Sequence, residues 1–186
     1  MNVIGISGVA GSGKDLFYSL LSARLNTRRM ALADELKREL RDFSISSYGI
    51  DPINCNREDK EKIRSLLVFH GNFKRKQTEG RYWIEKLNKA LDSSLSNQIS
   101  CITDIRHSEY ENDEVRWLKK ERKGVLVHIS RILKDGGIHQ APNEFERNND
   151  PILKNEADYR VYWHTTNDIA ELDCYIDKFI KWLDKR

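Results

Sequence analysis

Several features that mark other classes of protein are scarce in this sequence. The three cysteines, Cys55, Cys101 and Cys174, lie far apart without C-x-x-C spacing, which argues against a disulfide framework or a zinc site. No apolar run approaches the ~20 residues that a membrane-spanning helix needs, and no basic segment followed by an apolar stretch marks a secretory signal. We therefore expect reduced thiols, with Cys101 in the core, no membrane partner and a cytoplasmic location.

A strong charge of one sign is also missing. The formal net charge is +3, well short of the asymmetry of a dedicated nucleic-acid binder, so we expect no nucleic-acid partner and a protein that collects small anions. The histidines are scattered without metal-ligand spacing, and no Ser/His/Asp order suggests hydrolysis. At 186 residues, the chain is predicted to be a single domain over 1–186.

Strand-like and helix-like segments alternate along the chain. The predicted strands are 2–7, 28–33, 99–104, 124–130 and 159–163, and the predicted helices are 14–25, 34–43, 57–77, 81–95, 114–122 and 169–186. This alternation is typical of βαβ units, so we predict an α/β fold of three layers with a mainly parallel central sheet of about five strands. Residues 131–156 show no clear periodicity and are predicted to form a loop or lid.

The most informative segment is the G-x-x-x-x-G-K pattern from Gly8 to Lys14, which leaves an apolar strand and opens a helix. Glycines let backbone N–H groups turn inward around an anion, and the lysine can reach the β- and γ-phosphates of a nucleotide. We therefore predict a P-loop NTPase fold. The residues expected to bind ATP in this loop are Gly8, Val9, Ala10, Gly11, Ser12, Gly13, Lys14 and Asp15.

Two carboxylates are candidates for the Mg²⁺ that accompanies ATP. Asp15 stands where the pattern usually has a Ser or Thr ligand. Asp104 ends a predicted strand, where P-loop enzymes place an aspartate near the metal, although a turn or capping role is the alternative. Arg106 can bind phosphate oxygens with two nitrogens. We predict Lys14, Asp104 and Arg106 as catalytic residues, and Asp15 and Asp104 around the metal, directly or through water.

The acceptor substrate is predicted to bind in the helical region of about 34–95. Asp34, a residue type that favours helix N-caps, and Lys37 lie one turn apart and can face the same cleft, or belong to an ordinary surface helix. Arginines suit a phosphate and an aromatic ring suits a base, although Trp83 also suits the core. The acceptor candidates are Asp34, Lys37, Arg64, Arg81, Trp83 and Arg106. On the donor side, Arg131 and Arg147 flank the predicted lid and are expected to close over the phosphates.

Four segments, in chain order, carry a resemblance to a known family. They are "SGVAGSGKD", "ALADELKREL", "IRSLLVFHGNFKRKQTEGRYWIEKL", and "CITDIRHSEYENDEVRWLKK" followed by "GVLVHISR". Together they resemble the phage-type deoxynucleoside monophosphate kinases, in which GKD replaces GK[ST]. The resemblance implies Mg²⁺-dependent transfer of the ATP γ-phosphoryl group to a (deoxy)nucleoside 5′-monophosphate, in the host cytoplasm if the chain is phage-encoded. A homodimer is compatible with it.

Two alternatives stay open. The GKD sequence is also a feature of phosphomevalonate kinases, so the acceptor can be another small phosphorylated metabolite. A non-catalytic nucleotide-sensing module belongs to a different class, and the pairing of Asp104 with Arg106 disfavours it.

Overall fold

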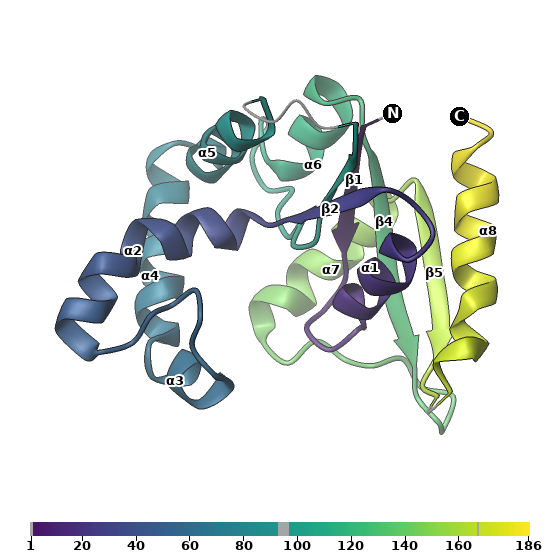
Figure 1. Ribbon diagram of the computed structural model, residues 1–186, viewed down its shortest axis with the longest axis horizontal. Helices are drawn as coiled ribbons and strands as arrows, with labels where there is room; N and C mark the ends of the chain where they lie inside the picture. The colour runs from purple at the N-terminus through teal and green to yellow at the C-terminus, as the bar shows by residue number, and fades with distance from the viewer. Residues whose placement is uncertain (1, 93–96, 167) are drawn as a thin grey trace.

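The computed structural model describes residues 2–92, 97–166 and 168–186, and its centre is a five-stranded sheet (Figure 1). All neighbouring strands are parallel, in the order β2-β3-β1-β4-β5. The strands are β1 (Val3–Ser7), β2 (Thr27–Met30), β3 (Ile99–Ile102), β4 (Val125–Ile132) and β5 (Tyr159–His164). The predicted α/β class and parallel sheet are confirmed. Because the strands are parallel, the segments that follow β1 and β3 leave the same edge of the sheet, where ligands of such folds bind.

One face of the sheet is covered by α1 (Lys14–Ser22) and α8 (Asp173–Leu183), which follows a 3-10 turn, Ile169–Leu172. Side chains on a strand alternate between the two faces. Ile4 of β1 therefore packs with Phe17 of α1 and Phe179 of α8 on this face, all of them fully buried. Cys101, as predicted, lies in the same core.

The opposite face is covered by α5 (Arg81–Asp92), α6 (Glu114–Arg116) with its π-helical continuation Trp117–Glu121, and α7 (Glu144–Glu156). Val3, the neighbour of Ile4, points to this face and packs in a cluster with Trp83, Trp117 and Leu153. Helices on both faces give the three layers that the sequence predicts. No described helix is long and apolar enough to cross a membrane.

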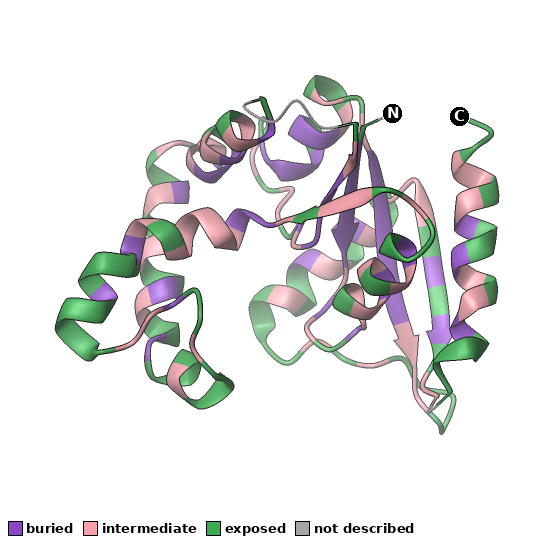
Figure 2. Cartoon of the chain, in the orientation of Figure 1, coloured by how far each residue is buried: buried purple, intermediate pink, exposed green. Residues whose placement is uncertain are grey.

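Three further helices project away from the sheet, toward the left of Figure 1. They are α2 (Leu32–Tyr48), α3 (Arg57–Lys62) and α4 (Arg64–Gln77). Their own buried core is small and consists of Leu40, Ile63 and Leu67. Figure 2 shows their outer turns mostly exposed, whereas β1 and β4 are largely buried. We call α2, α3 and α4 the helical region.

Several predicted elements have different bounds in the structure, and two of the differences affect the helical region. Residues 32–33 were expected in a strand but open α2, whose N-cap is Ala31, so Asp34 lies inside the first turn and does not cap the helix. The single helix expected over 57–77 is divided at Ile63, whose ψ of 3° is not helical. The end of the helix predicted over 81–95 lies partly outside the described residues.

The prediction of an irregular segment over 131–156 was wrong for its second half, which forms α7. Its buried positions, Asn149 and Leu153, include only one apolar residue, and Pro151 stands inside the helix, so the apolar periodicity that predicts a helix is missing. A signal was nevertheless present, because Asn143 is followed three residues later by Glu146. The Asn143 side chain caps the helix by accepting a hydrogen bond from the Glu146 N–H at 2.9 Å.

Candidate functional site

The loop of residues 8–13 between β1 and α1 has a backbone that is shaped by its glycines. Gly8, Gly11 and Gly13 have φ angles of 133°, 82° and 96°, which favour glycine. A Cβ on Gly8 would lie 2.4 Å from the Ile129 carbonyl oxygen, so a larger residue does not fit. Of the described side chains, none makes a hydrogen bond to the buried Ser12 hydroxyl. The loop therefore has the conformation that its glycines predict.

Lys14, the first residue of α1, folds back over this loop. Its Nζ donates to the carbonyl oxygens of Gly8 at 2.7 Å and Val9 at 2.9 Å. Burial, and next the positive charge of Arg106, lower the pKa of Lys14 to about 8. A half-buried ammonium that has only neutral carbonyl acceptors is suited to receive a phosphate oxygen, which is a stronger acceptor.

The two carboxylates predicted around the metal lie in different environments. Asp15 is exposed in the first turn of α1, where the helix dipole and Lys14 favour an anion. The described residues contain no group of three or more His, Cys, Asp or Glu able to hold a metal by themselves. Mg²⁺ is commonly bound by one or two carboxylates together with substrate phosphates, and the exposed Asp15 fits that arrangement.

Asp104 caps the start of α2, and a capping role was the alternative that the sequence left open. The N-cap of α2, Ala31, offers no side-chain acceptor. The Asp104 carboxylate supplies it instead, accepting from the Leu32 N–H at 2.8 Å and the Ala33 N–H at 2.9 Å. Burial raises the pKa of Asp104. Each oxygen is therefore already engaged, and Asp104 joins the end of β3 to the start of the helical region.

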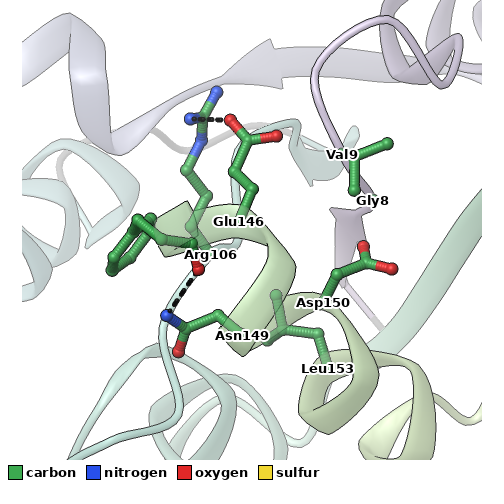
Figure 3. A pocket seen from close by; sticks show the side chains of 8 residues that line it. Gly8, Val9, Arg106, Glu146, Asn149, Asp150 and Leu153 are labelled. Atoms are coloured by element: carbon green, nitrogen blue, oxygen red, sulfur yellow. Dashed lines mark hydrogen bonds and ion pairs between the residues drawn. The ribbon is translucent and has the colours of Figure 1, made fainter. Parts of the chain in front are cut away.

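The backbone at Arg106 is held by a buried carboxylate. Glu114 accepts from the N–H groups of Arg106 at 2.6 Å and His107 at 3.0 Å. Burial, and next the charge of Asp113, raise the pKa of Glu114 to about 8. The Arg106 side chain is 46% exposed and points to Glu146 of α7, at 3.4 Å (Figure 3). Arg106 is thus held at its backbone, while its guanidinium is partly exposed.

Two residues that sequence reasoning missed contact the phosphate loop. Glu146 accepts the Ala10 N–H at 2.6 Å, and His139 Nε2 lies 2.9 Å from the Ala10 carbonyl oxygen. The predicted donor-side residue Arg131 reaches the loop through His139, with 3.3 Å between Arg131 Nη2 and His139 Nδ1. Arg147, by contrast, is exposed on α7. Figure 3 shows the pocket beside the loop, which is lined by Gly8, Val9, Arg106, Phe145, Glu146, Asn149, Asp150 and Leu153.

Lys60 of the helical region is influenced by several positive charges, that of Arg106 included. Burial lowers the pKa of Lys60 on α3, and so do three positive charges around it. Those charges belong to Lys37 on α2, Arg64 on α4 and Arg106 after β3. Arg64 also forms an ion pair with Glu61. Three cations from separate elements thus act electrostatically on Lys60, which the sequence did not reveal.

The predicted pair on α2 lines a second pocket. Its lining residues are Arg29, Asp34, Lys37, Arg38 and Ile53. Asp34 forms an ion pair with Arg29 at 2.9 Å, which leaves Lys37 as the cation shared by this pocket and the group around Lys60. Asp34 and Lys37 therefore face the same hollow, as their spacing suggested.

Two acceptor candidates lie elsewhere. Trp83 is 7% exposed in the core, and its indole N–H donates to the Gly71 carbonyl oxygen at 3.0 Å, so its ring is not available to a base. Arg81 forms ion pairs with Glu85 at 2.6 Å and Glu121 at 2.5 Å. The structure places both in the packing of α5, and the substrate-binding prediction is corrected for Trp83.

Comparison with known proteins agrees with the geometry. The fold, with the loop after β1 and a helical region beside it, is shared with a solved kinase structure. Among solved structures, a dephospho-CoA kinase from Campylobacter jejuni matches with a TM-score of 0.52 over 99% of this chain and 98% of that chain, at 15% sequence identity. No protein-family model matches the sequence, and no curated protein matches it.

Proposed function

We propose that this chain is an ATP-dependent kinase whose acceptor is a (deoxy)nucleoside 5′-monophosphate. The observation that carries the proposal is the position of Arg106. Its charge acts on Lys14 of the phosphate loop and also on Lys60 of the helical region. The charge of a single arginine thus reaches both a donor-type loop and a group of cations suited to a second phosphate.

Phosphoryl transfer requires positioning and charge neutralisation more than covalent chemistry. The loop amides and Lys14 would hold the ATP phosphates, and Arg106 would neutralise charge on the transferred group. When bound, Mg²⁺ would supply further neutralisation between the phosphates, with Asp15 the carboxylate best placed beside it. Asp104 would act by fixing the start of α2 relative to the sheet. Its role as a metal ligand stays a prediction.

The acceptor is proposed to be a phosphate monoester because the molecule has more basic side chains around Lys60 than the binding of ATP alone requires. Lys37, Lys60 and Arg64 come from three helices outside the layers around the sheet. The resemblance to phage-type deoxynucleoside monophosphate kinases narrows the class to nucleotides. The acceptor of the structural neighbour, as its name gives it, provides a further compound to assay.

A coupled ATP-consumption assay tests the proposal. The panel contains the deoxynucleoside and ribonucleoside monophosphates, dephospho-CoA and mevalonate 5-phosphate. Turnover with a nucleoside monophosphate, with a diphosphate product seen by chromatography, would support it. Turnover with only one of the other two compounds would change the acceptor and keep the kinase. ATP binding without turnover on any of them would favour the sensing module.

A further inference from the structure

The carboxylate of Glu146 lies against the groups that the proposed function assigns to phosphate. Its Oε2 accepts the Ala10 N–H at 2.6 Å although the two residues are 136 positions apart in the chain. Its Oε1 lies 3.4 Å from Arg106 Nη1. The Glu146 charge also acts to raise the pKa of Lys14. A loop amide, an arginine and the loop lysine thus all interact with one internal anion.

Helix α7 holds this carboxylate in place. The Asp150 carboxylate lies 2.9 Å from Nε2 of the buried His128 on β4, and Leu153 packs in the core, so the middle of the helix is fixed to the sheet. Near the helix start, the ring of Phe145 lies 4.9 Å from that of His107. The Glu146 side chain is only 11% exposed. The contact therefore belongs to the packed structure of the molecule.

Helix capping does not account for this contact. A glutamate three residues after an N-cap commonly reaches back to the cap residue, and Glu146 Oε1 does lie 3.5 Å from Asn143 Nδ2. That interaction leaves Oε2 free, and Oε2 extends instead to the loop. A single N–H group cannot donate fully to a carboxylate and to a phosphate oxygen at once, and two anions at that distance repel each other.

We propose that Glu146 is an autoinhibitory carboxylate that occupies a phosphate subsite of the loop, and that a nucleotide phosphate must displace it to bind. The inference rests on the proposed function for the identity of the displacing group. Displacement also breaks the ion pair with Arg106. Binding of ATP therefore releases the Arg106 guanidinium, which the transfer step requires. Arg106 thus becomes available only when ATP is bound.

The test is Mg·ATP and Mg·ADP binding to the full chain by isothermal titration calorimetry, with Glu146→Gln as the variant. Glutamine keeps the size of the side chain and its capping geometry but removes the charge. We expect both nucleotides to bind at least about tenfold more tightly, which corresponds to about 1.4 kcal/mol. Glu144→Gln is the matched control, because Glu144 is exposed in the same turn of α7, and its affinities should equal those of the wild type.

Hydrogen exchange at the amides of the phosphate loop provides a second readout that needs no turnover. Exchange at Ala10 should be faster in Glu146→Gln than in the wild type, and Mg·ATP should protect that amide in both. Unchanged exchange and unchanged affinity would overturn the inference. A variant that binds nucleotide no more tightly but loses turnover would also overturn it, and would place Glu146 among the groups that act on substrate or metal.

The two proposals can fail separately. Tighter nucleotide binding by Glu146→Gln, with no turnover on any acceptor, would support the autoinhibitory carboxylate and reject the kinase. Normal kinase turnover with equal affinities in wild type and variant would reject the carboxylate alone. If neither protein binds a nucleotide at millimolar concentration, both are rejected.

Discussion

The phosphate loop and the helical region are stabilised in different ways. The loop is enclosed by other parts of the chain: the Trp163 indole donates to the Ser12 carbonyl oxygen at 2.9 Å, Glu146 accepts the Ala10 N–H, and His139 contacts the Ala10 carbonyl oxygen. The helical region has a small core and carries exposed apolar side chains. These include Phe43, Val68, Phe69 and Phe73, which are 47% to 68% exposed.

The basic residues of the two regions differ in the same way. Lys14 is fixed inside the loop by two carbonyl oxygens. Arg64 is more than half exposed and pairs with Glu61 on the surface, and such pairs contribute little to stability. The proposed donor side is therefore enclosed by packed parts of the chain, whereas the proposed acceptor side belongs to a region that local unfolding or movement can reach at lower cost.

The largest effect is expected at the enclosed loop. Lys14→Ala should leave the fold intact but remove charge stabilisation of the transition state worth several kcal/mol, so turnover should fall at least about a hundredfold. Steady-state kinetics at saturating ATP would measure the loss, with circular dichroism as the control for folding. Near-normal turnover would contradict the assignment of the phosphate loop.

Core substitutions should separate the two regions by stability. Leu21→Ala removes a fully buried side chain from the main core, and the cavity should cost about 2–5 kcal/mol of global unfolding free energy. Leu40→Ala lies in the small core of the helical region, and its effect should stay near the lower end of that range. Urea denaturation would give both values, and hydrogen exchange should show local opening of α2 and α4 only in Leu40→Ala. Equal costs with no local opening would mean that the two regions unfold as one unit.

Arg106 lies between the two regions, and its substitution should affect them unequally. Arg106→Lys keeps the charge but loses the bidentate contact, at a cost of about 1.5–3 kcal/mol, or about ten- to a hundredfold in kcat/KM for the monophosphate. ATP binding measured without acceptor should change much less. Equal weakening of both substrates would place Arg106 on the donor side, and no effect would make it a surface charge.

Substitution of Asp15 tests whether its carboxylate contributes to Mg²⁺ binding at the proposed donor site. Asp15→Ser restores the commoner hydroxyl of such loops and removes one exposed negative charge beside the expected metal, so the Mg²⁺ concentration for half-maximal activity should rise several-fold. Titration of activity with Mg²⁺ at fixed ATP would measure it. An unchanged titration curve would show that Asp15 only complements the helix dipole.

The smallest effect concerns the contact between the helical region and α5. Burial alone would raise the pKa of Glu39, but hydrogen bonds from Lys86, His70 and Tyr82 outweigh it and lower the pKa to about 2. Because the folded-state pKa lies below the ordinary value of 4.5, the stabilisation is present above pH 4.5 and is lost as the pH falls toward 2.

Glu39→Gln should therefore destabilise the protein near neutral pH, and the difference from wild type should shrink in acid. Urea midpoints at pH 7 and pH 3 would measure this. Glu58→Gln, at a side chain that is 82% exposed, is the control and should show little difference at either pH. A Glu39 difference that grows in acid would contradict the assignment.

The elements that sequence alone predicted are those with a strong local signal. The strands around 2–7, 99–104 and 124–130 are short, largely apolar runs, and buried parallel strands have that composition. The strand around 159–163 alternates buried and exposed residues. The phosphate loop could be predicted because its pattern of glycines followed by Lys14 is local in the sequence, and glycine permits the positive φ angles of this loop. Element boundaries were less accurate at α2, since its start is fixed by the Asp104 carboxylate from a distant part of the chain.

What the sequence by itself determined is therefore the α/β class, the parallel sheet and the loop, because these depend on local periodicity and on glycine conformation. Only the tertiary structure decided that Trp83 is core, that Lys60 joins the other cations, and that Glu146 lies on the Ala10 amide. The physical reason is distance along the chain: groups such as the Ala10 N–H and the Glu146 carboxylate, 136 positions apart, meet only when helices pack on the sheet, and no local pattern encodes that contact.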